Sequence, residues 1–318
     1  MTQLLVTNCL GTFIIQNKKI TDKIFFKEAK DFTNQKLIVQ HEVQLVKKHP
    51  TAKKEAFFVF PQAKEYLEKF YSTNIAIAKQ ACKDAVKKEH YVMQAVETIQ
   101  DIERTLHPLV KRVRQWYSLY CPEVNESIAN HEAFIKVIIT KKKAELLKEF
   151  HLYSSMGAEM SAADLAPLQH LAEQIHGIYV QKQAMEEYIE KALHDIAPNL
   201  AAVAGPLLAA ELLAKVGSLE KLAKMPASTV QVIGAEDAMF RHLRKQGRCP
   251  RHGIIIKHPL LAGAKEELHG KIARKIAAAL SLAAKLDYFK GDAYKGYELR
   301  EKLDSGVATI VNRKRTSK

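Results

Sequence analysis

An apolar repeat with alternating spacings of three and four residues runs through residues 164–196 and constrains the fold more than any other feature of the sequence. A repeat of this kind, sustained over about four heptads, predicts one long helix in a left-handed supercoil. Ser161 and Asp164 stand three residues apart just before it, as in a capping box at a helix start. The positions of the repeat are Leu168, Leu171, Ile175, Ile178, Lys182, Met185, Ile189, Ala192 and Ile196, with Lys182 as the polar interruption.

We expect the helix over 164–196 to pair with residues 120–150 as an antiparallel hairpin roughly 45–50 Å long. The alternative is an ordinary core helix of a bundle, which has the same periodicity. A second apolar repeat, over residues 92–120, is interrupted by one acid and by Pro108. It predicts another long helix with a kink near Pro108. Its positions are Val92, Val96, Ile99, Glu103, Leu106, Val110, Val113, Tyr117 and Tyr120.

The first 60 residues show a different pattern, in which short runs of β-branched and aromatic residues alternate with polar segments. Such runs are typical of strands, so we expect a small sheet domain. The runs are QLLVTN (3–8), GTFII (11–15), KLIVQ (36–40) and AFFVF (56–60), and the segments QNKK, TDK and KKHPTAKK between them are expected turns. Some of the aromatic side chains are expected to face a partner, because Phe13, Phe25, Phe26, Phe57, Phe58 and Phe60 are more than so small a sheet readily buries. The alternative is that all six form the core.

Beyond Pro198 the chain is rich in alanine and helical in pattern, with breaks at glycine and proline residues. The last clear helix is expected over residues 271–289, with an apolar face. Residues 312–318, NRKRTSK, contain no core-forming side chain and are expected to be a disordered basic tail. The sequence therefore predicts a mainly α protein with a small N-terminal α/β domain, a long helical hairpin and an all-helical C-terminal domain.

The positive charge of the chain is concentrated in one window. Lys and Arg outnumber Asp and Glu by 49 to 35, a net charge of +14 that suits a polyanionic partner, nucleic acid first and an anionic membrane second. Residues 241–275 hold ten Lys or Arg and two acids, which is +8 of that surplus. Glycines and prolines make RKQGRCPRHG (244–253) a loop, and a basic loop can follow a phosphate backbone with side chains and main-chain N–H groups. The alternative is a solvated charged face.

Signatures of enzymes and of bound metals are missing from the sequence. It contains no GxGxxG, Walker A or GxSxG segment, and His131-Glu132 lacks the second histidine of HExxH. The four cysteines are scattered without the spacing of a zinc site or a disulfide framework. The N-terminus does not resemble a secretory signal, and the longest apolar run is about half of a membrane span. We expect a soluble, intracellular protein with no cofactor, no metal and no catalytic residue.

Several segments, in order along the chain, resemble the Nop domain of box C/D ribonucleoprotein core proteins in its archaeal form. They are EEYIEKALHDIAPNLAAVAGPL (186–207), GSLEKLAKMPASTVQVIGAEDAMFRHLR (217–244), RHGIIIKHPLL (251–261) and GKIARKIAAALSLAAKLDYF (270–289). VRQWYSLYCPEV (113–124) resembles the family's entry into its coiled coil, and CLGTFIIQNKKI (9–20) resembles the first strands of its fibrillarin-binding domain. Two positions depart from the family's pattern: Asp237 stands where GAEK has lysine, and Ala201 stands where threonine is common.

The resemblance implies a non-catalytic scaffold that binds box C/D guide RNA and recruits fibrillarin for 2′-O-methylation of RNA. The implied parts are a fibrillarin-binding α/β domain (1–76), long helices with a dimerising coiled coil (77–197), a Nop domain (198–311) and the basic tail (312–318). A kink-turn-binding protein of ribosomal type is a further partner, and S-adenosylmethionine would bind fibrillarin and not this chain. The alternatives are a spliceosomal-type Nop-domain factor that recruits no methyltransferase, and an RNA-modifying enzyme, which needs a nucleotide or metal site.

The resemblance also implies site residues and a location. The archaeal form, together with the end of the chain seven residues after Val311, implies a cytoplasmic protein, or a nucleolar one in a eukaryote. The expected RNA-binding residues are Glu236, Arg241, Arg244, Lys245, Arg248, Arg251, His252, Lys257, Lys271 and Arg274. The expected dimerisation residues are Leu168, Leu171, Ile175, Ile178, Met185 and Ile189, and the expected fibrillarin-binding residues are Phe13, Phe25 and Phe26.

Overall fold

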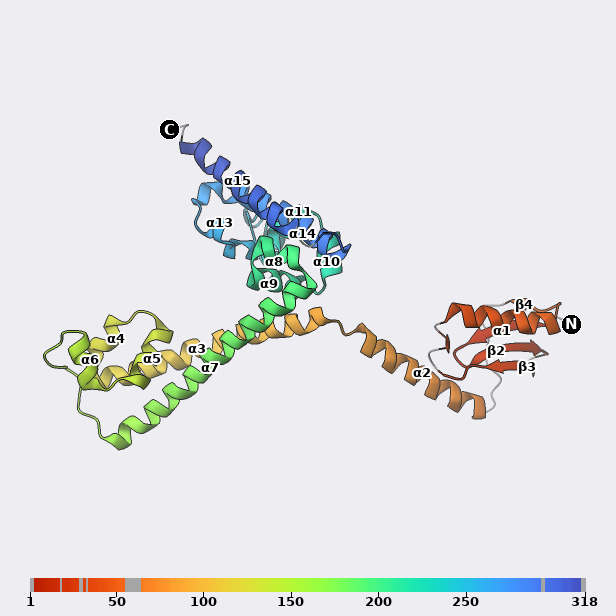
Figure 1. Cartoon of the computed structure of the whole chain (residues 1–318), viewed down its shortest axis with the longest axis horizontal. Helices are drawn as coiled ribbons and strands as arrows, with labels where there is room; N and C mark the ends of the chain where they lie inside the picture. Colours follow the sequence, from red (N-terminus) through yellow and green to blue (C-terminus); the bar gives the residue numbers. More distant parts are fainter. Residues whose placement is uncertain are drawn as a thin grey trace. The chain divides into compact units, whose positions relative to one another are not determined.

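The computed structural model describes residues 3–17, 19–28, 31–32, 34–54, 64–292 and 295–315. The chain divides into two compact units, Met1–Lys87 and Lys88–Lys318. The first unit is a small sheet with two helices, and the second is entirely helical in its described part (Figure 1). This confirms the predicted fold class, mainly α with a small N-terminal α/β domain.

The N-terminal unit is a four-stranded sheet in the order β3-β2-β1-β4. Neighbouring strands are antiparallel, except that β4 runs parallel to β1. One face of the sheet packs Leu5 and Ile14 against Leu45 of α1, and the other packs a core that includes Phe13 against Phe70 of α2. The elements are β1 (Leu4–Asn8), β2 (Gly11–Gln16), β3 (Lys19–Phe25), α1 (Gln35–Lys48), β4 (Lys53–Lys54) and α2 (Lys64–Ala85).

Two predictions for the N-terminal unit are wrong. The run KLIVQ (36–40) is part of helix α1, because the Asn34 side chain caps the helix by accepting from Leu37 N at 3.4 Å and the buried Leu45 lies two turns further on. The expected turn TDK (21–23) is the middle of β3, where side chains alternate between exposed and half-buried as a strand requires. The expected strand AFFVF (56–60) lies outside the described residues.

The second unit is built on two long helices, α3 (Lys88–Tyr120) and α7 (Ala162–Ile196), which pack along one another (Figure 1). Short helices at one end form a tip, and the remaining helices form a bundle at the other end. The tip helices are α4 (Pro122–Ser127), α5 (His131–Thr140) and α6 (Lys143–Glu149). The bundle contains α8 (Pro198–Ala204), α9 (Pro206–Val216), α10 (Leu219–Lys224), α11 (Ala227–Val232), α12 (Glu236–Leu243), η2 (Ile254–Lys257), α13 (Pro259–Ala262), η3 (Glu266–Leu268), α14 (His269–Tyr288) and α15 (Lys295–Arg315).

The predicted long helix over 164–196 is confirmed, but its predicted partner is wrong. The helix begins after Ser161, whose Oγ accepts from Asp164 N at 3.2 Å. It packs chiefly against α3, which continues as one helix through Pro108, and within 120–150 it contacts the short helix α5 instead of one long antiparallel helix. Pro122 and the Asn130 side-chain cap each start a new short helix, so the chain between 120 and 150 has no single long face to offer.

The seam between α3 and α7 pairs the polar interruptions of the two apolar repeats. Glu103 and Lys182 meet at 2.7 Å, and Lys182 lies 3.7 Å from Glu186. The apolar positions of the α3 repeat that flank Glu103 are buried, from Val92 through Tyr117. Such a polar pair in an apolar seam favours one register, since any slip would place each charge against apolar side chains.

The six residues expected to hold two copies together lie in the core of one chain. Leu168 and Ile175 are buried in the tip core, and Ile189 is buried in the bundle core. Leu171, Ile178 and Met185 are partly buried against the same cores. These residues stabilise the hairpin of α3 and α7 within one chain.

The tip is held by two charged side chains. Arg114 of α3 donates to Asn125 O at 2.9 Å and to Ile128 O at 2.6 Å, which ties the α4–α5 loop to the long helix. Glu123 accepts from Met156 N at 2.6 Å and from the Ser155 hydroxyl at 2.7 Å. Hydrogen bonds, first that from Met156 N, lower the pKa of Glu123 to about 2.

The bundle is centred on α14, which confirms the predicted helix over 271–289 within about two residues, but the prediction that it is the last helix is wrong, because α15 follows it. The buried face of α14, which includes Ile272, Ile276 and Leu280, packs against α8, α10, α11 and α15. The expected disordered tail is wrong in part, because the α15 backbone runs helically to Arg315. Leu303 and Val307 of α15 are buried in the bundle, and once a helix is anchored in this way, adding residues to its end costs little.

A buried polar clasp joins three helix ends of the bundle. The Asp287 carboxylate at the end of α14 accepts from Asn199 N at 3.0 Å and from Leu200 N at 2.8 Å. The Asn199 side-chain oxygen accepts from Gly296 N at 2.6 Å. Burial raises the pKa of Asp287, although these hydrogen bonds oppose the shift.

Among the described residues, no single helix is long and apolar enough to cross a membrane. The pair α8 and α9 passes such a test of length and composition only when taken together, and the two helices are bent by 115° at their junction.

The hairpin assignment can be tested at Ile175, which is fully buried in the tip core. Ile175→Asp is expected to lower the free energy of unfolding by at least about 3 kcal/mol, because the change removes apolar contacts and buries a carboxylate. Gln183→Asp, at an exposed position of the same helix, is the matched control and is expected to change stability by less than about 0.5 kcal/mol. Urea unfolding followed by circular dichroism measures both, and equal stabilities would contradict the seam.

Candidate RNA interface

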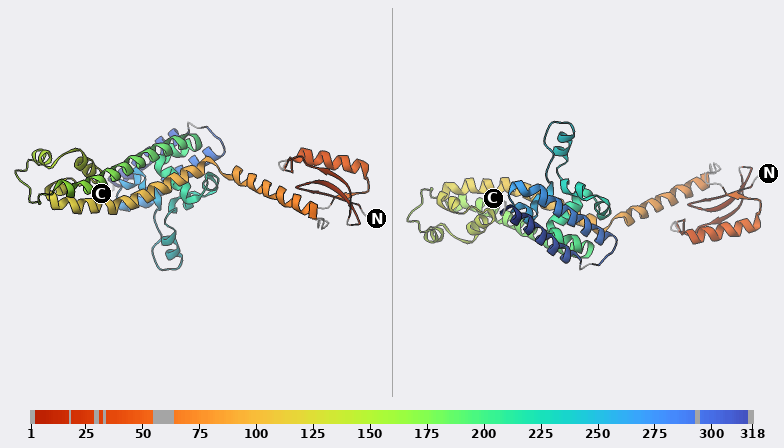
Figure 2. Two further views of the ribbon diagram at one scale, coloured as in Figure 1. Left: turned by 90° about the horizontal axis from the view of Figure 1, so that it is seen from below. Right: turned by 90° about the horizontal axis from the view of Figure 1, so that it is seen from above.

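Residues 234–253 project from the bundle as an arm made of α12 and the chain that returns from it (Figure 2). Backbone hydrogen bonds clamp its root, since Gly253 N donates to Gln231 O and Ile254 N donates to Ile233 O, both at 2.8 Å. The Gln231 side chain also donates to Arg251 O at 2.6 Å. The outgoing and returning chains of the arm therefore form a defined stem.

Glycines make this close approach of the two chains possible. A Cβ added to Gly253 would lie 1.8 Å from the carbonyl oxygen of Ile233, which no side chain tolerates. Gly234 has a φ of +82°, and a Cβ there would lie 2.3 Å from the Ile254 side chain. Gly234 N donates to the Glu236 carboxylate at 2.7 Å, so the expected RNA-binding residue Glu236 instead holds the start of the arm.

The far end of the arm is a tight helix C-terminus. Lys245 N donates to His242 O at 2.9 Å and Gln246 N donates to Arg241 O at 2.8 Å, the hydrogen-bond pattern of a Schellman motif. Lys245 takes the left-handed position with a φ of +60°, where glycine is usual, at a cost of about 1 kcal/mol or more. His242 Nδ1 lies 3.0 Å from Gly247 O and closes the turn. A strained lysine at an exposed turn is a pattern found at functional sites.

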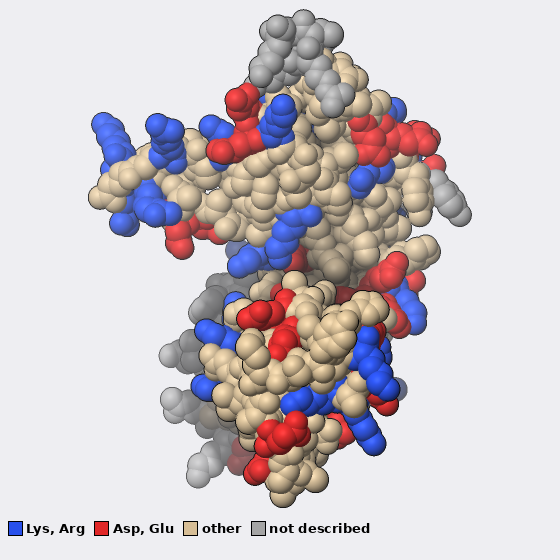
Figure 3. Space-filling model, turned by 90° about the vertical axis from the view of Figure 1, so that its left-hand side faces the viewer, with Lys and Arg blue, Asp and Glu red and all other residues tan. Residues whose placement is uncertain are grey.

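The expected cations gather on this arm (Figure 3). Arg241, Arg244, Lys245 and Arg248 are exposed and form no ion pair within the described part of the chain. The two acids of the arm, Glu236 and Asp237, lie in the first turn of α12. The far half of the arm is consequently a positive, solvent-facing surface on a rigid stem.

The returning chain meets the start of α14. The rings of His252 and His269 lie edge to face, with centroids 5.3 Å apart, and burial together with the nearby His269 lowers the pKa of His252. Arg251 donates to Glu266 O at 3.0 Å and lies 3.5 Å from its carboxylate. The next residues of α14 that were expected to bind RNA, Lys271 and Arg274, are both exposed on its first turns.

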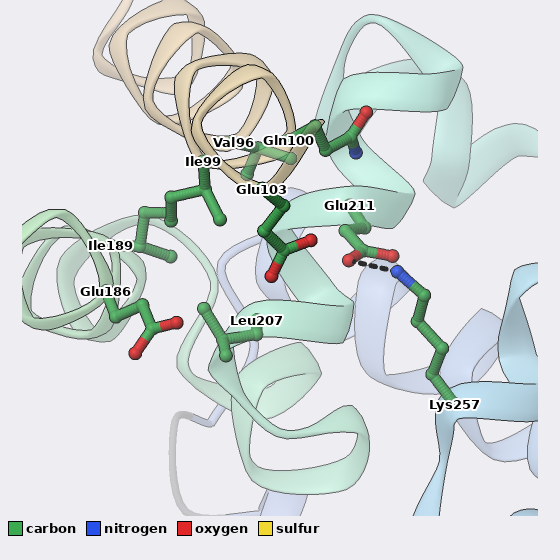
Figure 4. Close-up of a pocket in the computed structure, with 9 residues that line it drawn as sticks. All are labelled: Val96, Ile99, Gln100, Glu103, Glu186, Ile189, Leu207, Glu211 and Lys257. Atoms are coloured by element: carbon green, nitrogen blue, oxygen red, sulfur yellow. Dashed lines mark hydrogen bonds and ion pairs between the residues drawn. The ribbon is translucent and has the colours of Figure 1, made fainter. Parts of the chain in front are cut away.

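Lys257 is not part of this cationic surface. Its ammonium pairs with Glu211 of α9 at 2.6 Å, beside a cleft that Glu103 and Glu186 also line (Figure 4). The cleft lies where the hairpin meets the bundle, and Glu211 is the carboxylate that pairs with the lysine there. The sequence grouped Lys257 with the RNA-binding cations because it is only six residues beyond Arg251.

The expected fibrillarin-binding phenylalanines differ in exposure. Phe13 is only 1% exposed and belongs to the core of the sheet, so it offers no surface to a partner. Phe26 is partly buried and stacks on His41 with ring centroids 5.2 Å apart. Phe25 is 38% exposed, and the ammonium groups of Lys23 and Lys69 lie within 6 Å of its ring centroid.

Exposed apolar side chains were missed by the sequence analysis. Phe240 and Leu243 of α12 are 59% and 69% exposed, one turn apart on the arm. On α1, Val39, Val43 and Val46 form an exposed stripe at helical spacing. A helical wheel would have found each stripe, but only the structure shows that none of the described elements covers it.

A known protein family matches most of the helical unit. The family described as "Nop: snoRNA binding domain, fibrillarin" matches residues 98–308, which is more than half of the chain. This chain belongs to the Nop family. The match includes most of α3, all of α7, the arm and most of α15, so the arm lies within the Nop-matching region.

Relatives of this Nop-family chain occur in archaea and eukaryotes. An uncharacterized NOP5 family protein of Methanocaldococcus jannaschii is 39% identical over 264 residues, covering 77% of this chain and 63% of that protein. Nucleolar protein 58 of Homo sapiens is 32% identical over 247 residues, covering 72% of this chain and 47% of that protein. The chain thus spans between about half and two thirds of the length of these relatives. A chain in the crystal structure of a fibrillarin/NOP5P complex is similar with a TM-score of 0.43 and 20% identity, covering 95% of this chain and 99% of that one.

The root of the arm can be tested at Gly253. Gly253→Ala forces a Cβ against the Ile233 carbonyl and is expected to lower the free energy of unfolding by about 1–3 kcal/mol and to expose the arm to proteolysis. Gly247→Ala is the matched control, because its Cβ would meet only the Arg241 side chain at 3.8 Å. Limited proteolysis and urea unfolding measure the difference. Identical cleavage rates for the two variants would show that the root tolerates a side chain.

Proposed function

We propose that this chain is a non-catalytic scaffold of a box C/D ribonucleoprotein, which grips guide RNA with the arm and recruits fibrillarin through the N-terminal unit. The observation that carries the proposal is the set of four unpaired cations on a clamped, projecting arm within the Nop-matching region. By its similarity to an archaeal relative, the protein would act in the cytoplasm of an archaeon.

The arm suits phosphate recognition without base specificity. Arg241, Arg244, Lys245 and Arg248 are spread over one helix end and one turn, so they can reach several phosphates of a curved backbone. The stem fixes where those charges stand, which lowers the ordering cost of binding. A kink-turn-binding protein that has already bent the RNA would present such a backbone to the arm.

Methyl transfer belongs to the partner in this proposal. Fibrillarin would bind S-adenosylmethionine and carry out the reaction, while this chain holds the enzyme and the RNA on one scaffold. The N-terminal unit lies largely outside the Nop-matching residues and carries Phe25 and the valine stripe of α1 on its surface. Exposed apolar side chains of this kind are typical anchors of protein interfaces.

Self-association would use the outer face of the hairpin. On α7, Val180 and Tyr188 are 54% and 45% exposed, and Gly177 opens a groove toward Thr98 and Ile102 of α3. The groove also includes Ile178, so this face adjoins the partly buried edge of the seam. We therefore assign the dimer contact to this outer face.

The RNA contact can be tested by changing Arg244, Lys245 and Arg248 together to alanine. Binding of guide RNA with its kink-turn protein is expected to weaken for every RNA sequence, and the slope of log affinity against log salt is expected to flatten by roughly two to three units. The thermal stability of the protein is expected to stay unchanged, because exposed cations contribute little to folding.

The matched control removes three exposed cations from the N-terminal unit, Lys36, Lys79 and Lys83. This control is expected to keep wild-type affinity and slope. If the arm variant and the control bind alike, the arm is a solvated face and the RNA surface lies elsewhere.

Recruitment of fibrillarin can be tested with the triple variant Phe25→Ala, Val39→Ala, Val43→Ala. Affinity for fibrillarin is expected to fall at least about tenfold, because the variant truncates the exposed apolar anchors. Affinity for RNA serves as the internal control and should not change. Fibrillarin binding that is unaffected refutes this interface, and a wild-type chain that binds RNA but no fibrillarin favours the spliceosomal-type alternative.

A further inference from the structure

A fully buried histidine, His258, joins the C-terminal helix α15 to the rest of the bundle. Its Nε2 lies 3.0 Å from Val203 O in the last turn of α8, and its Nδ1 accepts from Leu260 N at 3.2 Å at the start of α13. Arg300 of α15 donates to the same Val203 O at 2.9 Å. One carbonyl oxygen of α8 thus receives hydrogen bonds from both α15 and the residue that caps α13.

These hydrogen bonds fix the protonation state of the His258 ring. Because Nδ1 accepts from the Leu260 N–H, Nδ1 carries no proton, and the single proton of the neutral ring lies on Nε2, which donates to Val203 O. A second proton can go only to Nδ1, where it would face the Leu260 N–H. The ring would then be a cation with its Nε2 3.4 Å from the Arg300 guanidinium. Protonation therefore breaks the N-cap of α13 and brings two like charges into contact.

We propose that His258 is an acid-sensitive latch, which holds α15 on the bundle while its ring is neutral and releases the helix when the ring is protonated. Release would expose Leu303 and Val307, the α15 side chains that are buried in the bundle core. Histidine protonation is a common basis of pH switches, because the ring titrates close to neutral pH. The inference is independent of the proposed function, since it rests only on contacts within this chain.

The acids of the neighbouring helices are already engaged, so they offer a protonated His258 little compensation. On α15, the Asp304 carboxylate accepts from Arg300 Nε at 3.1 Å and is therefore paired with a cation. On α9, Glu211 pairs with Lys257, the residue before the histidine. Helices α8 and α11 contain no charged residue.

Helix α14 completes the surroundings of the latch. Its one acid, Asp287, is held in the buried clasp by the backbone N–H groups of Asn199 and Leu200. At its start, His269 Nε2 lies 3.1 Å from Ala264 O. The cations of α14 occupy exposed positions, Lys271, Arg274, Lys275 and Lys285.

The direction of the pH effect follows from the contacts of His258. Burial, the largest cause, and Arg300 lower the pKa of His258, whereas the hydrogen bond to Val203 O and the charge of Asp304 oppose the shift. The released state binds the proton more readily, so the latch is fully stable above the ordinary histidine pKa of about 6.5 and weakens as the pH falls below it. The clasp at the start of α15 has the opposite sign, because burial raises the pKa of Asp287 and acidification then favours its folded state.

The test is hydrogen exchange of the full-length chain, read by mass spectrometry between about pH 7.5 and about pH 5 and corrected for the intrinsic pH dependence of exchange. Below about pH 6.5, the opening of α15 is expected to rise by up to about tenfold for each pH unit, the slope for uptake of one proton. In His258→Gln, whose amide can still donate and accept, the opening is expected to lose this pH dependence. The matched control His269→Gln, at another histidine of the bundle, is expected to keep the wild-type profile.

A second pair of variants tests the latch from the side of α15. Arg300→Gln removes the cation beside the ring, so the pKa of His258 is expected to rise and the total acid-induced increase in α15 opening to shrink. Lys302→Gln, which removes an exposed cation from the same helix, is the control and is expected to behave like the wild-type chain.

Two results would overturn the proposal. One is a wild-type α15 that opens equally at both ends of the pH range, and the other is a His258→Gln variant that follows the wild-type profile. Should that variant fail to fold, titration of His258 in the wild-type chain, followed by NMR of carbon-13-labelled histidine, decides the matter. A His258 ring that becomes protonated while α15 stays protected from exchange shows that the histidine is no latch.

Discussion

The packing of α3 against α7 is the interaction on which the helical unit depends. Both helices contribute to two separate cores, since Ile99 and Ile189 lie in the bundle core while Val110 and Ile175 lie in the tip core. Loss of the seam would therefore disconnect the bundle from the tip. The ion pair of Glu103 and Lys182 adds little stability at its partly exposed position, but it distinguishes the correct register from a slipped one.

The arm is stabilised differently from the seam, by backbone hydrogen bonds and not by a core. None of its exposed side chains belongs to a core, so its sequence is free to carry charge and apolar groups for a partner. Its position is fixed at the root by backbone hydrogen bonds and by the absence of a side chain at Gly253. The strain of Lys245 in the left-handed region is offset by the two backbone hydrogen bonds that close the turn, from Lys245 N and Gln246 N. A rigid stem with a charged end fits the proposed role of the arm, since the stem fixes where the charges stand.

Much of the fold could be predicted because it follows from spacing along the chain. The helix over 164–196, its start at the Ser161 cap and the apolar face of α14 are all local patterns, and each is confirmed. The predictions that failed depended on context. KLIVQ has strand propensity, but a cap at Asn34 and a buried Leu45 make it helical. In the tip, Pro122 and the Asn130 cap each start a new helix, so the chain forms short helices where one long helix was predicted.

The sequence by itself determined the helical periods, the small N-terminal sheet and the stretch of chain that carries the excess positive charge. It did so because these properties depend on neighbouring residues only. The tertiary structure decided which long helices pair, that Lys257 faces Glu211 while Arg241 to Arg248 face solvent, and that Phe13 is core while Phe25 is surface. Those outcomes depend on what residues far apart in the chain leave covered or exposed, and no local pattern contains that information.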